Sequence, residues 1–555
     1  MKSCRLLLLF FGLLTAFSLR AQPKYPQDLF RNPLAIPIRL AGNFGECRPN
    51  HFHSGIDIKT NGVENLPVHA AAAGYVSRIS LKPGGFGHCL YITHPEGYTT
   101  VYAHLNDFAK PLQALVRTAQ YRNENWELDT VLGPGVFPVA KGQQIAWSGN
   151  TGSSTAPHLH FEIRNTETER PLNPQLFGLT APDSRAPVLR NLYLYNLDNS
   201  IYQTPPRKIA LQKSGSSYRP AGGDTITTVA SRVGIGIDGD DYADGSENTL
   251  APLHTSLSAN GAPICNITLD DIGYDETRYL HAYADYCVKQ KGGPWVQLMF
   301  RLPGNNLTRI YDAPQDGIIS LGASPVAVEG SWEDAAGQQS RYSFWLKNSG
   351  KSASSCTPEW VVGKPISYQS PNLRLAATAA ALYDGVCETV RESPKASALS
   401  AAFQIGRPDI PLHTSLSVWI KPDRPVPFEQ RTKLALIRND GKAESGTPAA
   451  SDSERWYRGS AKAFGTFWLV ADTVAPAITP VKTGGGRLRF KITDKTTSVA
   501  AVRGEADGKW LLFEQHGDIW TYVFDDRLPK GTYNLKLTAT DAVGNQKTYT
   551  TRFTK

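Results

Sequence analysis

Two short segments of the chain carry side chains that could bind one metal ion. His53-Ser-Gly-Ile-Asp57 supplies an imidazole and a carboxylate, and His158-Leu-His160 supplies two more imidazoles. Hydrolytic zinc sites commonly use three protein ligands from His, Asp and Glu, and leave the fourth position for water. The two segments therefore offer the donors of a hydrolytic zinc site, with one side chain to spare.

Histidine is concentrated around these segments. The chain of 555 residues has 12 histidines, and eight of them fall between positions 51 and 160: His51, His53, His69, His88, His94, His104, His158 and His160. An even distribution would place far fewer of them there. The clustering therefore indicates a functional site.

The sequence from 158 to 164 alternates polar and apolar residues, as expected of a strand. Residues two apart in a strand point to the same face of a sheet. One face is predicted to be polar and the other apolar, with His158, His160, Glu162 and Arg164 on the first and Leu159, Phe161 and Ile163 on the second. Two imidazoles would then project side by side.

Two further features bear on the site. Gly55 permits the close turn that brings His53 and Asp57 to one point. His104 is expected to end a strand and to share a face with Tyr102. Hydrolysis needs a base for the attacking water and a group that stabilises the developing charge, so surplus imidazoles are informative. Spacing alone leaves open whether His51 is also a ligand.

Three phrases of this region resemble those of lysostaphin/LytM-type zinc metallopeptidases, which are peptidoglycan endopeptidases with a small β-sheet catalytic domain. They are His-Ser-Gly-Ile-Asp at 53–57, Tyr-Ala-His-Leu at 102–105 and Ser-Gly-Asn-Thr-Gly-Ser-Ser-Thr-Ala-Pro-His-Leu-His-Phe-Glu-Ile-Arg at 148–164. The resemblance covers roughly residues 40–175. It implies one Zn²⁺ ion bound by His53, Asp57 and His160, with His104 and His158 as the catalytic imidazoles.

The resemblance also bears on two neighbouring residues. The family has a glycine two residues after its first ligand, which fits His53 and Gly55 and makes His51 a rim residue. Arg48 resembles the arginine of a Phe-Gly-x-Arg phrase of the family, which implies that it orients the substrate or the groove wall.

The fold is predicted to be mainly β. The N-terminal domain would be an antiparallel β-sheet metallopeptidase domain of the duplicated hybrid motif type. Between 106 and 125, Phe108, Leu112, Leu115 and Val116 sit at helical spacing, so we expect a helical insertion there. The predicted divisions are a signal peptide at 1–21, the metallopeptidase domain at 22–180, and β-modules at 181–348, 349–471 and 472–555.

A weak repeat supports the division of the later part of the chain. Asp183-Ser-Arg-Ala-Pro187 recurs as Asp472-Thr-Val-Ala-Pro476, and Asp334-Ala-Ala-Gly-Gln-Gln339 recurs as Asp541-Ala-Val-Gly-Asn-Gln546. These paired start and end phrases predict immunoglobulin-like β-sandwiches at 181–348 and 472–555. A third β-rich module lies between them.

The N-terminus is typical of an exported protein. A basic head precedes an apolar run at 6–19, the pattern of a signal peptide, and this run is shorter than the about 20 residues of a membrane span. We expect a periplasmic, envelope or secreted protein with no membrane span after signal removal. Six cysteines would remain, and pairing in sequence order keeps each disulfide within one module: Cys47–Cys89, Cys265–Cys287 and Cys356–Cys387.

These observations predict an exported zinc-dependent endopeptidase that hydrolyses peptide cross-links of bacterial peptidoglycan. The β-modules would space the enzyme, localise it or bind an envelope partner. The formal charge of +8 is spread along the chain without a Lys/Arg run, which argues against nucleic-acid binding. Two alternatives stay open: a catalytically silent scaffold that activates another cell-wall hydrolase, and a peptidase that acts on a protein target.

Overall fold

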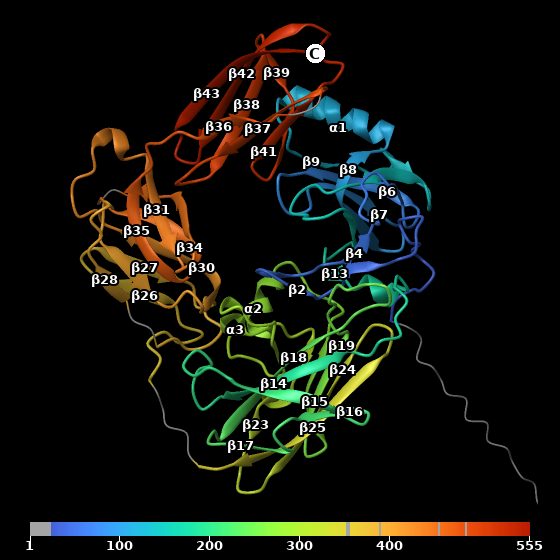
Figure 1. Cartoon of the computed structure of the whole chain (residues 1–555), viewed down its shortest axis with the longest axis vertical. Helices are drawn as coiled ribbons and strands as arrows, with labels where there is room; N and C mark the ends of the chain where they lie inside the picture. The colour runs from blue at the N-terminus through green and yellow to red at the C-terminus, as the bar shows by residue number, and fades with distance from the viewer. Residues whose placement is uncertain (1–23, 351–355, 388–389, 453–454, 483–484) are drawn as a thin grey trace, which may run out of the picture.

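The computed structural model describes residues 24–350, 356–387, 390–452, 455–482 and 485–555. The predicted signal peptide lies outside these residues. The protein is mainly β, as expected, and its parts follow one another in a ring in which the C-terminal strands return to helix α1 (Lys110–Asn123) (Figure 1). Within the described ranges, no helix is long and apolar enough to cross a membrane.

The N-terminal unit, residues 24–180, is built on an antiparallel sheet with the order β1-β4-β12-β8-β7-β6-β10. Strands β9, β11 and β13 pair with members of this path and β5 pairs with β11, while β2 and β3 form a separate two-stranded ribbon. The strands are β1 (Leu40–Gly42), β2 (Cys47–Arg48), β3 (His51–Phe52), β4 (Ile56–Lys59), β5 (Pro67–His69), β6 (Gly74–Leu81), β7 (His88–Thr93), β8 (Tyr98–Phe108), β9 (Leu128–Val131), β10 (Pro138–Val139), β11 (Gln144–Ser148), β12 (His158–Asn165) and β13 (Pro171–Leu172).

Strand β12 has the predicted alternation. Leu159, Phe161 and Ile163 are completely buried in the apolar core of the unit, so the opposite face carries His160 and Glu162. In the register of the sheet, His160 lies opposite Asp57 of β4 on one side and Ala103 of β8 on the other. The pairing of β4 with β12 thus brings together two segments about 100 residues apart.

Helix α1 is the predicted helical insertion. Its Leu112 and Val116 are buried against the N-terminal unit. Trp126, just after the helix, is buried in the core of the C-terminal module instead. The ring of Tyr121 packs edge-on against Trp510, with centroids 5.3 Å apart. The insertion therefore joins the first and last parts of the chain (Figure 1).

The second module, residues 181–350, has one 12-stranded sheet and two short helices, α2 (Leu280–Tyr283) and α3 (Tyr286–Gln290). The sheet runs in the order β21-β18-β14-β15-β16-β25-β24-β19-β20-β22, with β17 paired to β25 and β23 to β18. Its strands are β14 (Val188–Asn196), β15 (Arg207–Ser214), β16 (Ser217–Pro220), β17 (Thr225–Thr228), β18 (Arg232–Asp240), β19 (His254–Ala259), β20 (Ala262–Thr268), β21 (Gln297–Leu298), β22 (Tyr311–Asp312), β23 (Ile319–Ser320), β24 (Val326–Glu333) and β25 (Gln339–Asn348).

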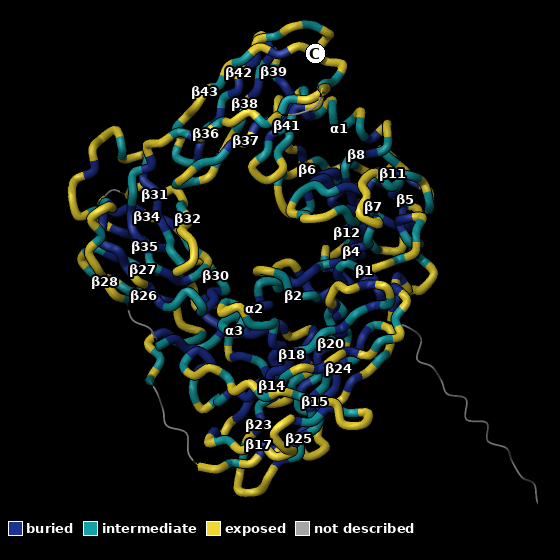
Figure 2. Tube along the Cα trace, viewed as in Figure 1, coloured by how far each residue is buried: buried dark blue, intermediate teal, exposed yellow. Residues whose placement is uncertain are grey.

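The third module, residues 356–471, has two five-stranded sheets, and the C-terminal module, residues 472–555, has two four-stranded sheets. Buried positions gather inside each part of the chain (Figure 2). The boundaries between the modules are those predicted from the sequence, and they stay predictions. The sheets of the third module are β26 (Ile366–Gln369), β27 (Leu373–Ala377), β30 (Pro411–Ile420), β34 (Tyr457–Ala463) and β33 (Ala450–Ser451), then β28 (Val390–Ser393), β29 (Ala402–Ile405), β35 (Gly465–Ala471), β31 (Leu434–Asn439) and β32 (Glu444–Pro448). Those of the C-terminal module are β36 (Ala477–Pro480), β37 (Arg487–Thr493), β41 (Ile519–Val523) and β40 (Phe513–His516), then β39 (Lys509–Leu511), β38 (Val499–Ala506), β42 (Thr532–Asp541) and β43 (Gln546–Thr554).

Cysteine pairing in sequence order is wrong for two of the three pairs. Cys356 and Cys387 form a disulfide, whereas Cys47, Cys89, Cys265 and Cys287 are free thiols. Cys89 is buried between strands of the N-terminal sheet and Cys47 packs against the core of the second module. The first predicted pair is therefore split between two cores, which the spacing of the residues does not reveal.

Candidate metal centre

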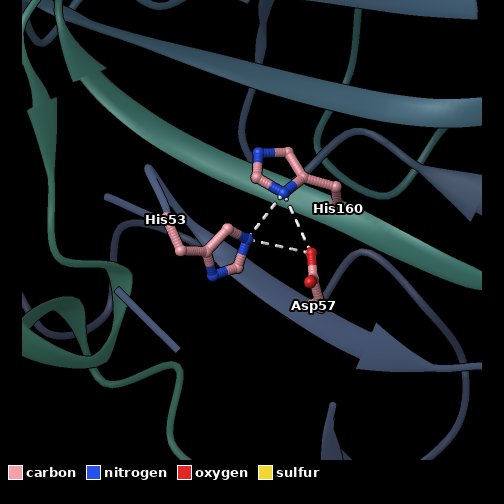
Figure 3. Close-up of side chains that lie close together, drawn as sticks. All are labelled: His53, Asp57 and His160. Carbon is pink, nitrogen blue, oxygen red and sulfur yellow. Dashed lines mark hydrogen bonds and ion pairs between the residues drawn. The ribbon is translucent and has the colours of Figure 1, made fainter. Parts of the chain in front are cut away.

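Three donor atoms converge on the polar face of the N-terminal sheet (Figure 3). His53 Nε2 lies 3.0 Å from Asp57 Oδ1 and 2.9 Å from His160 Nδ1, and His160 Nδ1 lies 2.9 Å from Asp57 Oδ1. Ligands of a tetrahedral zinc ion stand about 3.3 Å apart when each is about 2.0–2.1 Å from the metal. All three residues are buried. Their spacing fits one small ion.

Two local features place these ligands. Asp57 and His160 are register partners across β4 and β12. Gly55 lets the chain before β4 pass close to β12, because a Cβ atom there would lie 2.2 Å from the carbonyl oxygen of Phe161. The glycine predicted for a close turn is therefore required by a close approach of two backbones.

Each ligand has its remaining polar atom held by the protein. His53 Nδ1 donates to the carbonyl of Asn43 at 2.8 Å, which leaves Nε2 free to face the metal. Arg48 donates to Asp57 Oδ2 at 2.6 Å, so Arg48 orients a ligand. Such outer partners fix the orientation and tautomer of metal ligands. The donor set is therefore preorganised.

The third ligand, His160, is held by a carboxylate. Its Nε2 lies 3.1 Å from Glu162 Oε1, which leaves Nδ1 to face the metal. Burial acts to lower the pKa of His160, but hydrogen bonds to Asp57 and Glu162 raise it to about 9. The two carboxylates therefore favour positive charge at this point, as a divalent cation would supply.

Glu162 is the centre of a buried network that the sequence only partly indicated. Arg164 Nε donates to Glu162 Oε2 at 2.7 Å, and Ser54 donates its hydroxyl to Oε1. Burial acts to raise the pKa of Glu162, but the guanidinium of Arg164 and the contact with His160 hold it well below its ordinary value. Glu162 therefore stays ionised and can accept a hydrogen bond from the Nε2–H of His160.

Tyr274 completes this network from the second module. Its hydroxyl donates to Glu162 Oε1 at 2.6 Å and accepts from Arg164 at 2.8 Å. The ring of Tyr274 is partly exposed, but desolvation around its hydroxyl and the neighbouring carboxylate of Glu162 raise its pKa above the ordinary value, so the hydroxyl keeps its proton. No motif in the sequence surrounds Tyr274, and its role is visible only when the two modules are packed together.

Two more imidazoles stand at the same place. His158 Nδ1 donates to the carbonyl of Ala156 at 2.8 Å, and its Nε2 lies 3.4 Å from Asp57 Oδ1, buried and without a hydrogen bond in the described structure. His104 Nδ1 donates to the carbonyl of Thr151 at 2.8 Å, and the rings of His104 and His158 are 4.7 Å apart. In both rings Nδ1 is bound to a backbone carbonyl, so Nε2 is the nitrogen that is left to act at the site.

The predicted placement of His104 on the strand is wrong. Tyr102 points into the apolar core, where its hydroxyl accepts from the amide of Ala71. Strict alternation would turn His104 the same way, but its φ of 57° lies in the left-handed region, and the register of β7 and β8 shifts here. This β-bulge re-aims the side chain to the metal face, and β8 continues beyond His104 to Phe108.

His51 lies outside the donor group. Its side chain is exposed at the tip of the β2–β3 ribbon, and Nδ1 donates to the carbonyl of Pro49 at 3.0 Å. The second His-x-His motif therefore does not contribute a third imidazole to the converging atoms.

Two histidines and one aspartate on an antiparallel sheet, with further imidazoles beside them, define the mononuclear zinc hydrolase class. Comparison with known families specifies the class further. The profile of peptidase family M23 matches residues 51–121 and 137–174, so the chain carries a domain of this family. Its members are zinc-dependent metallopeptidases, which confirms the resemblance to lysostaphin/LytM-type enzymes and the predicted cofactor. A Zu5-like domain matches residues 361–472.

Relatives named as peptidases match about a quarter of the chain. An uncharacterized metalloprotease of Haemophilus influenzae is 34% identical over 27% of this chain and 28% of its own length. The peptidoglycan DD-endopeptidase ShyB of Vibrio cholerae is 31% identical over 26% of this chain and 28% of its own length. The solved catalytic domain of lysostaphin from Staphylococcus simulans is 25% identical over 25% of this chain and 90% of that one, with a TM-score of 0.19. The chain thus spans less than a third of these two curated relatives.

Proposed function

We propose that the protein is an exported zinc endopeptidase that hydrolyses peptide cross-links of bacterial peptidoglycan. In this proposal His53, Asp57 and His160 bind the zinc ion, and His104 and His158 act on the substrate and water. The observation that carries it is His158 Nε2, which is buried beside the three ligands and has no hydrogen-bond partner among the described residues.

The chemistry follows from the orientation of the two rings. A bound zinc ion would supply a Lewis acid that polarises the scissile carbonyl and activates water. His158 donates Nδ1–H to a backbone carbonyl, so its Nε2 can accept the proton of the attacking water and return it to the leaving amine. Burial, with His160 and His158 nearby, lowers the pKa of His104 to about 3, which keeps that ring neutral at rest.

His104 would stabilise charge that develops on the substrate. Its Nε2 faces the site because Nδ1 is bound to Thr151. The neutral ring has a lone pair at Nε2, so it must first take up a proton from solvent; negative charge on the former carbonyl oxygen favours this uptake, and the protonated ring then donates a hydrogen bond to that oxygen. The two imidazoles thus divide proton transfer and charge stabilisation.

The substrate and location rest on two supports. The relative from Vibrio cholerae is named a peptidoglycan DD-endopeptidase. The N-terminal segment has the pattern of a signal peptide, which would place the enzyme where peptidoglycan lies. We further propose that the later modules position the enzyme in the envelope.

Digestion of purified sacculi tests this function. The full chain should release peptides with new amine ends, identified by mass, and a zinc chelator should abolish the release until zinc is restored. Cleavage of a protein but not of sacculi would favour the protein-directed alternative. Full biological effect of His158→Ala in cells would favour the scaffold alternative and contradict the proposed enzyme.

A further inference from the structure

A second group of acidic side chains lies where the N-terminal unit meets the second module. Carboxylate oxygens of Asp183, Asp241 and Asp334 all lie within 4.8 Å of one another. Asp183 belongs to the segment before β14, Asp241 directly follows β18, and Asp334 directly follows β24. The fold therefore brings three acidic residues together from segments far apart in the sequence.

Two of these carboxylates are buried and form no ion pair among the described residues. Asp241 and Asp334 are each 2% exposed, and Asp241 Oδ1 and Asp334 Oδ2 have no hydrogen-bond partner in the described structure. Oδ1 of Asp334 already accepts from the amides of Ala336 and Gln338. An ionised carboxylate that is buried and unpaired is costly, so the free oxygens require a cation or a proton.

The nearest arginine does not meet this requirement. Arg185 donates its guanidinium to the backbone carbonyls of Tyr242, Ala243 and Ser246. None of the ion pairs found among the described residues involves Asp183, Asp241 or Asp334. Burial, together with the charges of Asp334 and Asp183, raises the pKa of Asp241 to about 7, although the charge of Arg185 acts in the opposite direction.

A small cavity lies against two of the carboxylates. Its lining includes Asp183 and Asp241 together with Leu40, Asn43 and Gln175 of the N-terminal unit. Its volume of about 10 Å³ has room for about one sphere the size of a water molecule. The space therefore suits a single ion rather than an organic ligand.

The repeat in the sequence provides an internal comparison. Asp472 and Asp541, which begin the equivalent phrases, meet with Asp494 in the C-terminal module. There Asn545 donates its side-chain amide to Asp541 Oδ2 at 2.8 Å, and Thr497 donates to Asp472 Oδ2 at 2.9 Å. The first group has a glutamine at the position of Asn545, and Oδ2 of its Asp334 lacks a donor. The carboxylates of Asp183, Asp241 and Asp334 therefore have fewer hydrogen-bond donors among the described residues than those of the C-terminal group, and a cation would stabilise them more.

We propose that Asp183, Asp241 and Asp334 bind one divalent cation, and that the cation is Ca²⁺. Calcium takes oxygen ligands in flexible geometry, whereas zinc in proteins prefers nitrogen and sulfur, so this site differs in chemistry from the His-Asp-His centre. The ion would tie the connecting segment to the ends of β18 and β24.

The site would also support the zinc centre through Asn43. The side chain of Asn43 bonds to the backbone of Ala251 in the second module, with its amide donating at 2.8 Å and its oxygen accepting at 2.8 Å. The carbonyl of the same residue accepts from His53 Nδ1. Because Asn43 lines the cavity beside Asp183 and Asp241, calcium would stabilise the packing on which this contact depends.

Calcium titration of the full chain tests the proposal. The protein is freed of metals, reloaded with one equivalent of zinc and titrated with CaCl₂ by calorimetry. We expect saturable binding with a dissociation constant below about 1 mM. Asp241→Asn and Asp334→Asn should each remove one equivalent of calcium binding, while the matched variant Asp541→Asn should not remove this equivalent. His160→Ala, which disrupts the zinc centre, should keep it.

Thermal unfolding separates loss of the ion from loss of the fold. Without calcium, Asp241→Asn should unfold at the same or a higher temperature than the wild type, since it removes an unpaired buried charge. Calcium should raise the unfolding temperature of the wild type and leave that of Asp241→Asn unchanged. Absence of calcium binding by the wild type, or an unchanged stoichiometry in both asparagine variants, would overturn the proposal. Neither result depends on peptidase activity.

Discussion

Histidine side chains have two proposed roles at the candidate centre, as metal ligands and as catalytic imidazoles. The hydrogen bonds of each ring determine which of its nitrogens faces the metal position. His160 turns Nδ1 to the metal position because Glu162 holds its Nε2, whereas His53 turns Nε2 there because Asn43 holds its Nδ1. His158 also has Nδ1 held by a backbone carbonyl, yet its Nε2 lies 3.4 Å from Asp57 Oδ1 and is not one of the three converging donors. Ligand and catalytic roles should therefore separate by mutation.

His158→Ala should keep zinc and lose activity, and His160→Ala should lose both. The first variant removes a proton acceptor, whose contribution is typically about 10²–10⁴-fold in rate, while the second removes a ligand. Zinc content by atomic absorption and cleavage of sacculi measure the two effects. His51→Ala, which alters an exposed ring, is the matched control and should change neither. Loss of zinc from His158→Ala would contradict this assignment.

Tyr274→Phe should weaken zinc binding by about tenfold, within the range seen when partners of metal ligands are removed. The change deletes the hydroxyl that donates to Glu162, which in turn holds His160. Competition with a chromophoric chelator measures the affinity. Tyr368→Phe, in the third module, should have no effect. Equal zinc affinity of wild type and Tyr274→Phe would show that the second module does not tune the site.

Among the strands, the sequence predicted what regular geometry controls. The alternation of β12 correctly placed Leu159 and Phe161 in the core and His160 on the metal face, because the period of a strand is two. His104 was placed on the wrong face because a β-bulge interrupts that period, and no residue type nearby marks it. The contact of Tyr274 with Glu162 joins two modules, so neither local pattern nor spacing could indicate it.

The bulge in β8 should tolerate glycine better than a β-branched residue at position 104. Both His104→Gly and His104→Val remove the imidazole, but valine is strained at a φ of 57° by about 1–2 kcal/mol. Since the amide of His104 donates to Phe86, amide exchange around β8 reports on this strain. We expect exchange in His104→Val to be about 5–30-fold faster than in His104→Gly. Equal rates would argue against a left-handed backbone here.

The ends of the chain are joined by packing that the sequence did not predict. The predicted helix at 106–125 is present as α1, but Trp126 and Tyr121 beside it contact the C-terminal module. Two ion pairs add to this contact, Arg117 with Glu514 at 2.9 Å and Arg503 with Glu124 at 2.8 Å. Nothing in the helical spacing distinguishes a side chain that meets its own unit from one that meets a module 400 residues away.

This contact should hold the arrangement seen in Figure 1. Replacing a buried tryptophan by alanine typically costs about 3–5 kcal/mol, and interfaces between modules of one chain otherwise permit relative motion. A Tyr121→Ala, Trp126→Ala double variant should therefore release the C-terminal module and increase the radius of gyration in small-angle X-ray scattering. Its zinc content should not change, because the ligands lie on β4, β12 and the segment before β4. Arg122→Ala, on an exposed position of the same helix, is the matched control and should scatter like the wild type. An unchanged radius of gyration in the double variant would mean that the remaining contacts suffice to keep the ends of the chain together.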